Sequence, residues 1–224
     1  MKYAFRNGFI LDGTRDMEPV SGKMILVNGD RIEDIVSDDL TYDGYETIDL
    51  KGSYILPGLI NMHVHLAGNG KPQKKQRDNT KLVNFIFSNP ASATVAYHLV
   101  KSYAKLELLS GVTTIRTVGG LKDLDTRVRD EIRNGKIIGP RILASNEGIS
   151  VPHGHMAGSV AMIANNNKEA LDQGDKLIEE KADLVKLMIT GGVMDAVVMT
   201  QGKLIRDPKL KRKEIVDREL DRFL

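Results

Sequence analysis

The sequence of 224 residues contains no cysteine. This absence excludes disulfides, iron–sulfur clusters and thiolate zinc sites, and it leaves histidine and the carboxylates as the available metal ligands. Long apolar runs are also missing, since no stretch approaches the roughly 18 residues of a membrane span, and the opening MKYAFRNGFI has no apolar signal-peptide segment. These absences predict a cytoplasmic protein that does not cross a membrane.

An excess of charge of either sign is missing as well. The 32 basic and 30 acidic residues nearly cancel, so no overall field favours nucleic acid or an anionic membrane as a partner. The hydrophobic content of 41% is sufficient to bury a core. We therefore expect a folded protein with a small-molecule ligand and no nucleic-acid partner.

Residues 1–57 are rich in β-branched and aromatic runs separated by turn signals. Asn7-Gly8, Asp12-Gly13 and Asn28-Gly29 are the dipeptides that most strongly favour hairpins. We expect a small antiparallel sheet or β-sandwich that forms a first domain over residues 1–57.

From Tyr54 onward, apolar strands alternate with charged segments of helical period, which is typical of an α/β fold with a parallel sheet. Gly111 and Gly135 stand where helices are expected to end. A complete (β/α)₈ TIM-type barrel needs roughly 250 residues, so residues 58–200 predict only about the first four β units. Residues 201–224 predict a charged, helical C-terminal tail. The predicted strands cover 54–66, 112–120, 140–148 and 182–192, and the predicted helices cover 91–111, 123–135 and 167–182.

Residues 69–90 form a long insertion between the first barrel strand and its helix. Five basic residues stand there against one acidic residue, Asp78: Lys71, Lys74, Lys75, Arg77 and Lys81. The segment fits either a loop that receives an anionic ligand or an ordinary solvated loop.

His63 and His65 lie two residues apart in the apolar run LINMHVHL. Residues i and i+2 of a strand share a face, so the two imidazoles point the same way. In a barrel strand this arrangement supplies half of a metal site. The alternative is a pair of core histidines that are hydrogen-bonded to their neighbours.

Lys186 interrupts the apolar run ADLVKLMITGG and shares a strand face with Leu184 and Met188. A buried lysine must pair with a carboxylate, reach solvent or lose its charge. A neutral lysine can react with carbon dioxide to give a carbamate, an anionic oxygen ligand for metals. The alternative is a lysine that extends from the strand end to solvent.

Taken in order, these motifs resemble the amidohydrolase superfamily of metal-dependent hydrolases, and within it the imidazolonepropionase-like and Xaa-Pro dipeptidase-like branch. The resemblance rests on Asn28-Gly29-Asp30-Arg31-Ile32, LPGLINMHVHL, GVTTIRTVGG, VPHGHMAG and DLVKLMITGG, between about residues 3 and 195. LPGL followed by His-x-His is the most specific of them.

The resemblance implies a set of site residues. His63 and His65 match the metal ligands of the first barrel strand, and Lys186 matches a lysine that is carboxylated to bridge metals. His153 and His155 fall in a histidine-rich loop near the substrate, although a structural role for that loop is the alternative. The implied cofactor is one or two divalent metal ions, usually zinc, and the implied reaction is hydrolysis of an amide, cyclic amide or dipeptide C–N bond.

Two departures from the family pattern limit this inference. Asn61 stands where the family often has aspartate, and no histidine follows His155. The ligands that the family takes from later strands, and its catalytic aspartate, therefore have no counterpart here, so the catalytic residue stays unknown. Three interpretations remain: a truncated amidohydrolase that is inactive alone, an edge-paired homodimer, and a non-catalytic binding or scaffold protein.

Overall fold

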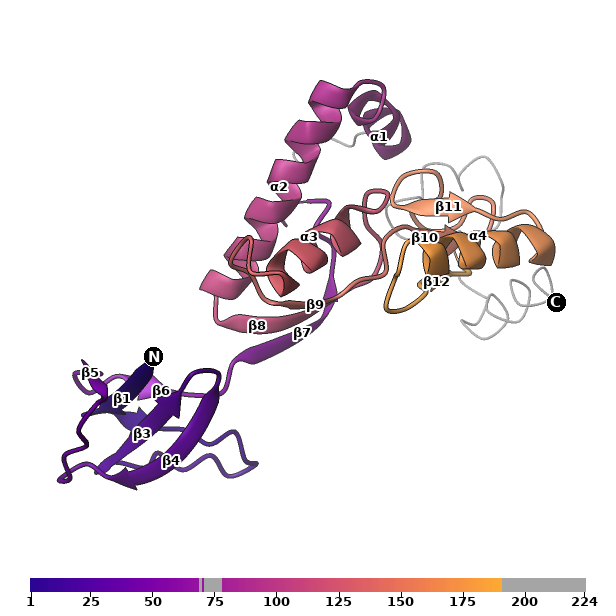
Figure 1. Ribbon diagram of the computed structural model, residues 1–224. Coiled ribbons are helices and arrows are strands. Elements are labelled where there is room, and N and C mark those ends of the chain that lie inside the picture. The colour runs from indigo at the N-terminus through magenta and orange to yellow at the C-terminus, as the bar shows by residue number, and fades with distance from the viewer. Residues whose placement is uncertain (69, 71–77, 191–224) are drawn as a thin grey trace. The chain divides into compact units, whose positions relative to one another are not determined.

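The computed structural model describes residues 1–68, 70 and 78–190 (Figure 1). The chain divides into two compact units, Met1–Gly58 and Leu59–Leu224. The domain division at residue 57 stays a prediction, because compactness alone does not show independent folding. The predicted helical tail at 201–224 lies outside the described residues.

The first unit is a mixed β-structure with a small core. Its four-stranded sheet has the order β4-β3-β1-β5, in which β1 is antiparallel to β3 but parallel to β5. Ala4, Met24 and Leu26 form the buried cluster on this sheet. A second, parallel pair joins β2 and β6. The strands are β1 Lys2–Arg6, β2 Phe9–Ile10, β3 Lys23–Asn28, β4 Arg31–Ser37, β5 Glu46–Asp49 and β6 Tyr54–Ile55.

Two of the predicted turns have different outcomes. Asn28-Gly29 joins β3 to β4 as an antiparallel hairpin, with Gly29 at a φ of 64°, so that prediction is confirmed. Asn7-Gly8 does not form a hairpin, because β2 pairs with β6 instead of returning along β1. A Cβ on Gly8 would lie 2.6 Å from Leu50 Cδ1, so this glycine allows the chain to pass close to another segment. The expectation of a small antiparallel sheet therefore holds for β1, β3 and β4, whereas β5 and the pair β2-β6 join in parallel.

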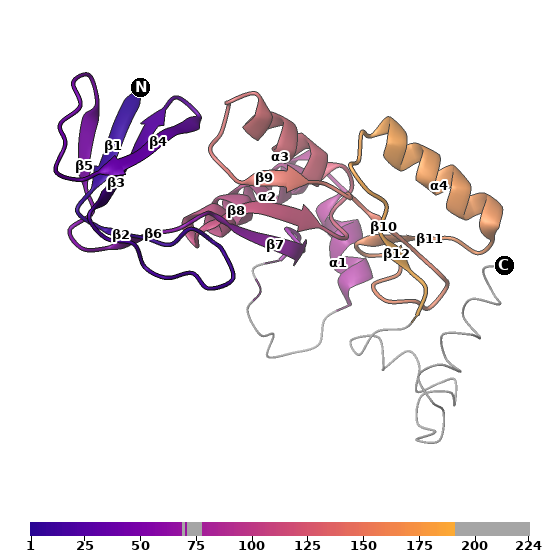
Figure 2. The same cartoon turned by 90° about the horizontal axis from the view of Figure 1, so that it is seen from below.

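The second unit alternates parallel strands with helices. Its first sheet has the order β7-β8-β9, and its second sheet has the order β11-β10-β12, with every pairing parallel. Figure 2 shows α4 lying alongside β10 and β11. The strands are β7 Leu59–Val64, β8 Val112–Thr117, β9 Arg141–Leu143, β10 Gly148–Ser150, β11 Ala161–Ile163 and β12 Leu187–Met188.

The three predicted helices of this unit are present as α2 Pro90–Leu109, α3 Leu124–Arg133 and α4 Asn167–Glu179. Helix α2 begins where the Asn89 side chain accepts from the backbone N–H of Ser92. Gly111 and Gly135 follow the last turns of α2 and α3 with φ values of 90° and 68°, which confirms them as helix-ending glycines.

Two segments differ from the prediction. Part of the insertion expected as a loop is a helix, α1 Asn79–Ile86, which starts where Asp78 accepts from the backbone N–H of Lys81. Residues 69 and 71–77, including four of the five basic residues of the insertion, lie outside the described residues. The strand expected at 140–148 ends as β9 at Leu143, and the chain then forms β10 and β11, which were not predicted.

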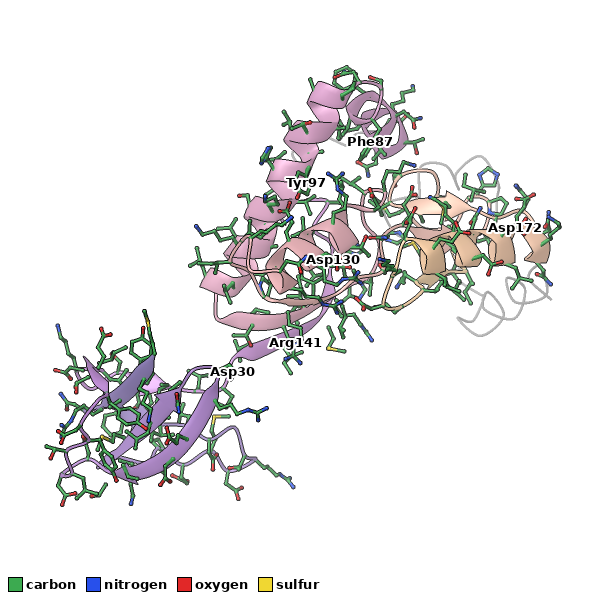
Figure 3. The ribbon with its side chains drawn as sticks, in the orientation of Figure 1. Asp30, Phe87, Tyr97, Asp130, Arg141 and Asp172 are labelled. Atoms are coloured by element: carbon green, nitrogen blue, oxygen red, sulfur yellow. The ribbon has the colours of Figure 1, made fainter. Side chains whose placement is uncertain are left out.

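The main core lies between the sheet β7-β8-β9 and helices α2 and α3. Ile115 of β8, Ile142 of β9 and Val128 of α3 are each at most 1% exposed within it. At its edge, Arg127 of α3 stacks over the ring of Tyr97 on α2, with the guanidinium carbon 4.5 Å from the ring centre. Figure 3 labels Tyr97 on α2. This packing fixes the carboxyl ends of β7 and β8, where the histidine pair lies.

Candidate metal centre

His63 lies within β7 and His65 directly follows it. The centres of their rings are 5.2 Å apart, so the two side chains share a face as predicted. Both histidines are exposed, whereas Val64 and Leu66, which alternate with them, are buried in the main core. The alternative of two buried core histidines is therefore wrong for the described part of the chain.

One hydrogen bond holds the ring of His65, and another holds the backbone of His63. Nδ1 of His65 lies 2.9 Å from the carbonyl oxygen of Gly119. A carbonyl can only accept, so Nδ1 carries a proton, and in the neutral ring Nε2 is the nitrogen with the free lone pair. The backbone N–H of His63 donates to Oδ1 of Asn61 at 3.2 Å, which gives the unusual Asn61 a structural role.

The electrostatic surroundings of His63 favour the neutral imidazole. Partial burial is the largest cause that lowers the pKa of His63, followed by electrostatic interactions with His65, Lys186, Arg116 and His155. The neutral form is the one that binds a metal. Lys186 and His155, which are distant in sequence, are therefore within electrostatic reach of the histidine pair.

Lys186 lies immediately before β12 and is half-buried. Its carbonyl oxygen accepts from the backbone N–H of Ile149 at 2.8 Å, which ties it to β10. Met188, two residues after Lys186, extends toward Gly119. If Gly119 had a Cβ, that atom would lie 3.1 Å from Cε of Met188. The segment that carries Lys186 and β12 thus packs beside Gly119, the residue that holds His65.

His153 and His155 have different environments. His153 is exposed and has a φ of 60°. His155 is half-buried, and its backbone N–H donates to the carbonyl oxygen of Thr190 at 2.9 Å. Of the two histidines, His155 is the one that the fold brings toward the candidate site.

The donor set fits a metal only in part. Within residues 1–68, 70 and 78–190, no group of three or more His, Asp and Glu side chains gathers as a metal site. Two adjacent imidazoles, one with its free nitrogen fixed, are suitable ligands for a zinc-like cation. A cavity of about 360 Å³ adjoins them, lined in part by His63, His65, Tyr103 and Glu107.

Sequence reasoning missed the residues that support the pair. Gly119 and Gly120 follow β8, and Asp125 in the first turn of α3 is 1% exposed. The Gly-Gly pair at the end of the strand predicted at 112–120 was a signal of close backbone approach. Nothing in the local sequence distinguishes Asp125 from an ordinary first-turn aspartate.

Comparison with known proteins gives a consistent result. A model of the amidohydrolase family matches residues 54–209. A presumed prolidase from Bifidobacterium longum is 29% identical, and the match covers 85% of this chain and 41% of that protein, with a TM-score of 0.66. An Xaa-Pro dipeptidase with bound methionine is 28% identical over 86% of this chain and 48% of its own, with a TM-score of 0.69.

A shorter match joins the chain to a dihydroorotase from Bacillus pumilus, 40% identical over 75 residues, or 34% of this chain and 17% of that protein. The chain thus spans less than half the length of each of these relatives. The TIM-type α/β fold is confirmed at the level of fold type, while the partial barrel and the β-sandwich stay predictions. No helix within the described residues is long and apolar enough to span a membrane.

Proposed function

Since this chain belongs to the amidohydrolase family, we propose that His63 and His65 are metal ligands of a hydrolase that cleaves C–N bonds in small molecules. The observation that carries the proposal is the 2.9 Å contact between Nδ1 of His65 and the carbonyl oxygen of Gly119. Metal-binding histidines usually donate their second N–H in this way, because the bond fixes the tautomer and the ring orientation.

The proposed ligands are the imidazole nitrogens of His63 and His65 and a carbamate on Lys186. A bound divalent cation, which we propose to be zinc, supplies a Lewis acid that polarises a carbonyl and makes water more acidic. The neutral amine of Lys186 forms the carbamate when its nitrogen attacks carbon dioxide and loses one proton.

The substrate is proposed from the names of the relatives. Prolidases and Xaa-Pro dipeptidases act on dipeptides, and the name dihydroorotase denotes action on a cyclic amide. We propose a dipeptide or a cyclic amide, with His155 contacting it because His155 lies within electrostatic reach of His63. His153 is the weaker substrate-binding residue of the pair, because it points to solvent.

Metal content tests the proposal. The purified chain should bind zinc, measured by elemental analysis after dialysis, and His63→Ala and His65→Ala should each lower the affinity at least about tenfold. His98→Ala is the matched control, because His98 is an exposed histidine on α2. Zinc content that is equal in all four proteins, or absent from the unaltered chain, would contradict the assignment.

The open edge of β7 favours a second candidate, the edge-paired homodimer that acts as a binding or scaffold protein. Within the described residues β7 pairs with β8 alone. Leu59, Ile60 and Met62 on β7 are 52%, 65% and 46% exposed. An apolar strand with a free edge readily pairs with another chain. Sedimentation velocity tests this candidate, because a monomer at all concentrations would exclude it.

A further inference from the structure

The backbone N–H groups of Gly119 and Gly120 each donate a hydrogen bond that holds this turn in place. The backbone N–H of Gly119 donates to Oγ of Ser145 at 2.8 Å, and that of Gly120 donates to the carbonyl oxygen of Asn146 at 2.7 Å. Gly119 has a φ of 120°, which residues with a Cβ rarely adopt. The peptide between these glycines therefore has one orientation, and its carbonyl oxygen is the one that meets Nδ1 of His65.

The carboxyl group of Asp125 lies directly against this peptide. A Cβ built on Gly120 would be 2.5 Å from Oδ2 and 2.9 Å from Oδ1 of Asp125, so the carboxyl occupies the space that a side chain would need. Glycine Cα–H groups are weak hydrogen-bond donors to such an oxygen. The turn and the carboxyl are thus mutually dependent, since each leaves room for the other.

Asp125 lacks the partners that a buried carboxyl normally has. Neither of its oxygens is hydrogen-bonded with good geometry within the described residues, although the Thr117 hydroxyl lies near enough to act on it. Burial raises the pKa of Asp125 to about 6, and the Thr117 hydroxyl opposes this rise. A buried carboxyl without partners destabilises a fold, and such groups concentrate at functional sites.

We propose that Asp125 is a positioning residue for the metal site, acting through the Gly119-Gly120 peptide on His65. This inference rests on the proposed function. The negative carboxyl beside the peptide makes the carbonyl oxygen of Gly119 a stronger acceptor. The stronger acceptor holds the Nδ1–H donor of His65 more firmly and so fixes the orientation of the ring. Carboxylates that contact metal-binding histidines directly act in this way, and here a peptide group stands between the two.

The decisive variant is Asp125→Asn, which keeps the shape and removes the charge. We expect the His65 imidazole signals in ¹H–¹⁵N spectra of the metal-free full chain to shift, with a smaller population protonated on Nδ1. We also expect the affinity for Co²⁺, used as a spectroscopic probe, to fall about tenfold. The control is Asp172→Asn on α4, an exposed aspartate (Figure 3) that should leave both measurements unchanged.

A second variant, Gly120→Ala, keeps every charge but pushes the carboxyl away from the peptide. It should shift the His65 signals in the same direction. Unchanged His65 signals and unchanged Co²⁺ affinity in Asp125→Asn would overturn the proposal. An Asp125→Asn chain that fails to fold would also overturn it, because a neutral amide should be easier to bury than a carboxyl.

The two proposals can fail separately. If the unaltered chain binds no Co²⁺, the metal site is refuted, while the His65 spectra still report whether Asp125 acts on the Gly119 carbonyl. If Co²⁺ binds and only the Asp125 variants behave like the unaltered chain, the metal site stands and the role of Asp125 does not.

Discussion

Two buried charged residues lie one turn apart on helix α3, and they differ in how many partners the fold provides for them. Arg129 is 3% exposed and donates to Asp183, to Asp130 and to the carbonyl oxygen of Lys181. Asp125, which is 1% exposed, has no such set of partners within the described residues. The comparison indicates that the second turn of α3 serves stability, whereas the first turn retains an unfavourable group beside the candidate metal site.

The largest expected effect comes from removing Arg129, the buried charge that has hydrogen-bond and ion partners. Arg129→Met leaves Asp183, which also accepts from the backbone N–H of Ala144, with only the more exposed Arg133 at 3.5 Å as an ion partner. Removing one member of a buried ion pair costs about 3 kcal/mol or more. Urea unfolding followed by circular dichroism should show this loss, and a loss below about 1 kcal/mol would show that the network contributes little.

A smaller effect, of opposite sign, should follow from removing the unsatisfied charge. Because the pKa of Asp125 rises from 3.8 to about 6 on folding, the folded chain holds a proton that the unfolded chain has released. The contribution of Asp125 to the free energy of unfolding therefore falls as pH rises from about 4 to 6. Asp125→Asn should match the unaltered chain near pH 4 and exceed its stability by roughly 3 kcal/mol or less at pH 7.

Asp183 provides an internal contrast for that measurement. Burial acts to raise the pKa of Asp183, but the hydrogen bonds from Ala144 and Arg129 outweigh it and hold the pKa below its ordinary value. Its contribution to stability is present above the ordinary pKa and is lost as pH falls, which is the reverse of Asp125. The unaltered chain and Asp125→Asn both contain Asp183, so its contribution cancels when their free energies of unfolding are subtracted. If the difference in free energy of unfolding between the two proteins does not change with pH, the raised pKa does not belong to Asp125.

The smallest expected effect is at an exposed pair on α4. Lys168 and Asp172 are 2.8 Å apart at positions i and i+4, and their side chains are 85% and 60% exposed. Solvent screens such pairs, so Lys168→Met should change the free energy of unfolding by about 0.5 kcal/mol or less. A change above 1 kcal/mol would mean that an exposed ion pair on α4 contributes as much to stability as the buried charges of α3.

Local patterns predicted much of this fold, because they depend on short-range chemistry. The run around His63, the helix ends at Gly111 and Gly135 and the hairpin at Gly29 each carry their signal within a few residues. Strand β10 carries no such signal, since Gly148–Ser150 is extended only because it pairs with β11 and β12. Helix α1 was missed although Asp78 gave a capping signal, because the basic residues before it favoured a loop.

The candidate site was predicted less completely than the fold. Spacing alone brought His63 and His65 to one face, but their exposure depends on which face of β7 the helices cover. The contacts of Gly119 with His65 and of Gly120 with Asp125 join segments far apart in the chain. Such contacts are set by tertiary packing, and single-sequence reasoning does not reach them.

The pairing of β7 with β8 has a consequence for synthesis on the ribosome. Leu59 pairs with Val112, so β7 emerges about 50 residues before its partner strand, which at about 5–20 residues per second is a delay of roughly 3 to 10 s. During that interval Leu59, Ile60 and Met62 have no strand beside them in this sheet. We expect the nascent chain to bind a general chaperone such as a hydrophobic holdase at β7, and to release it once β8 has been made.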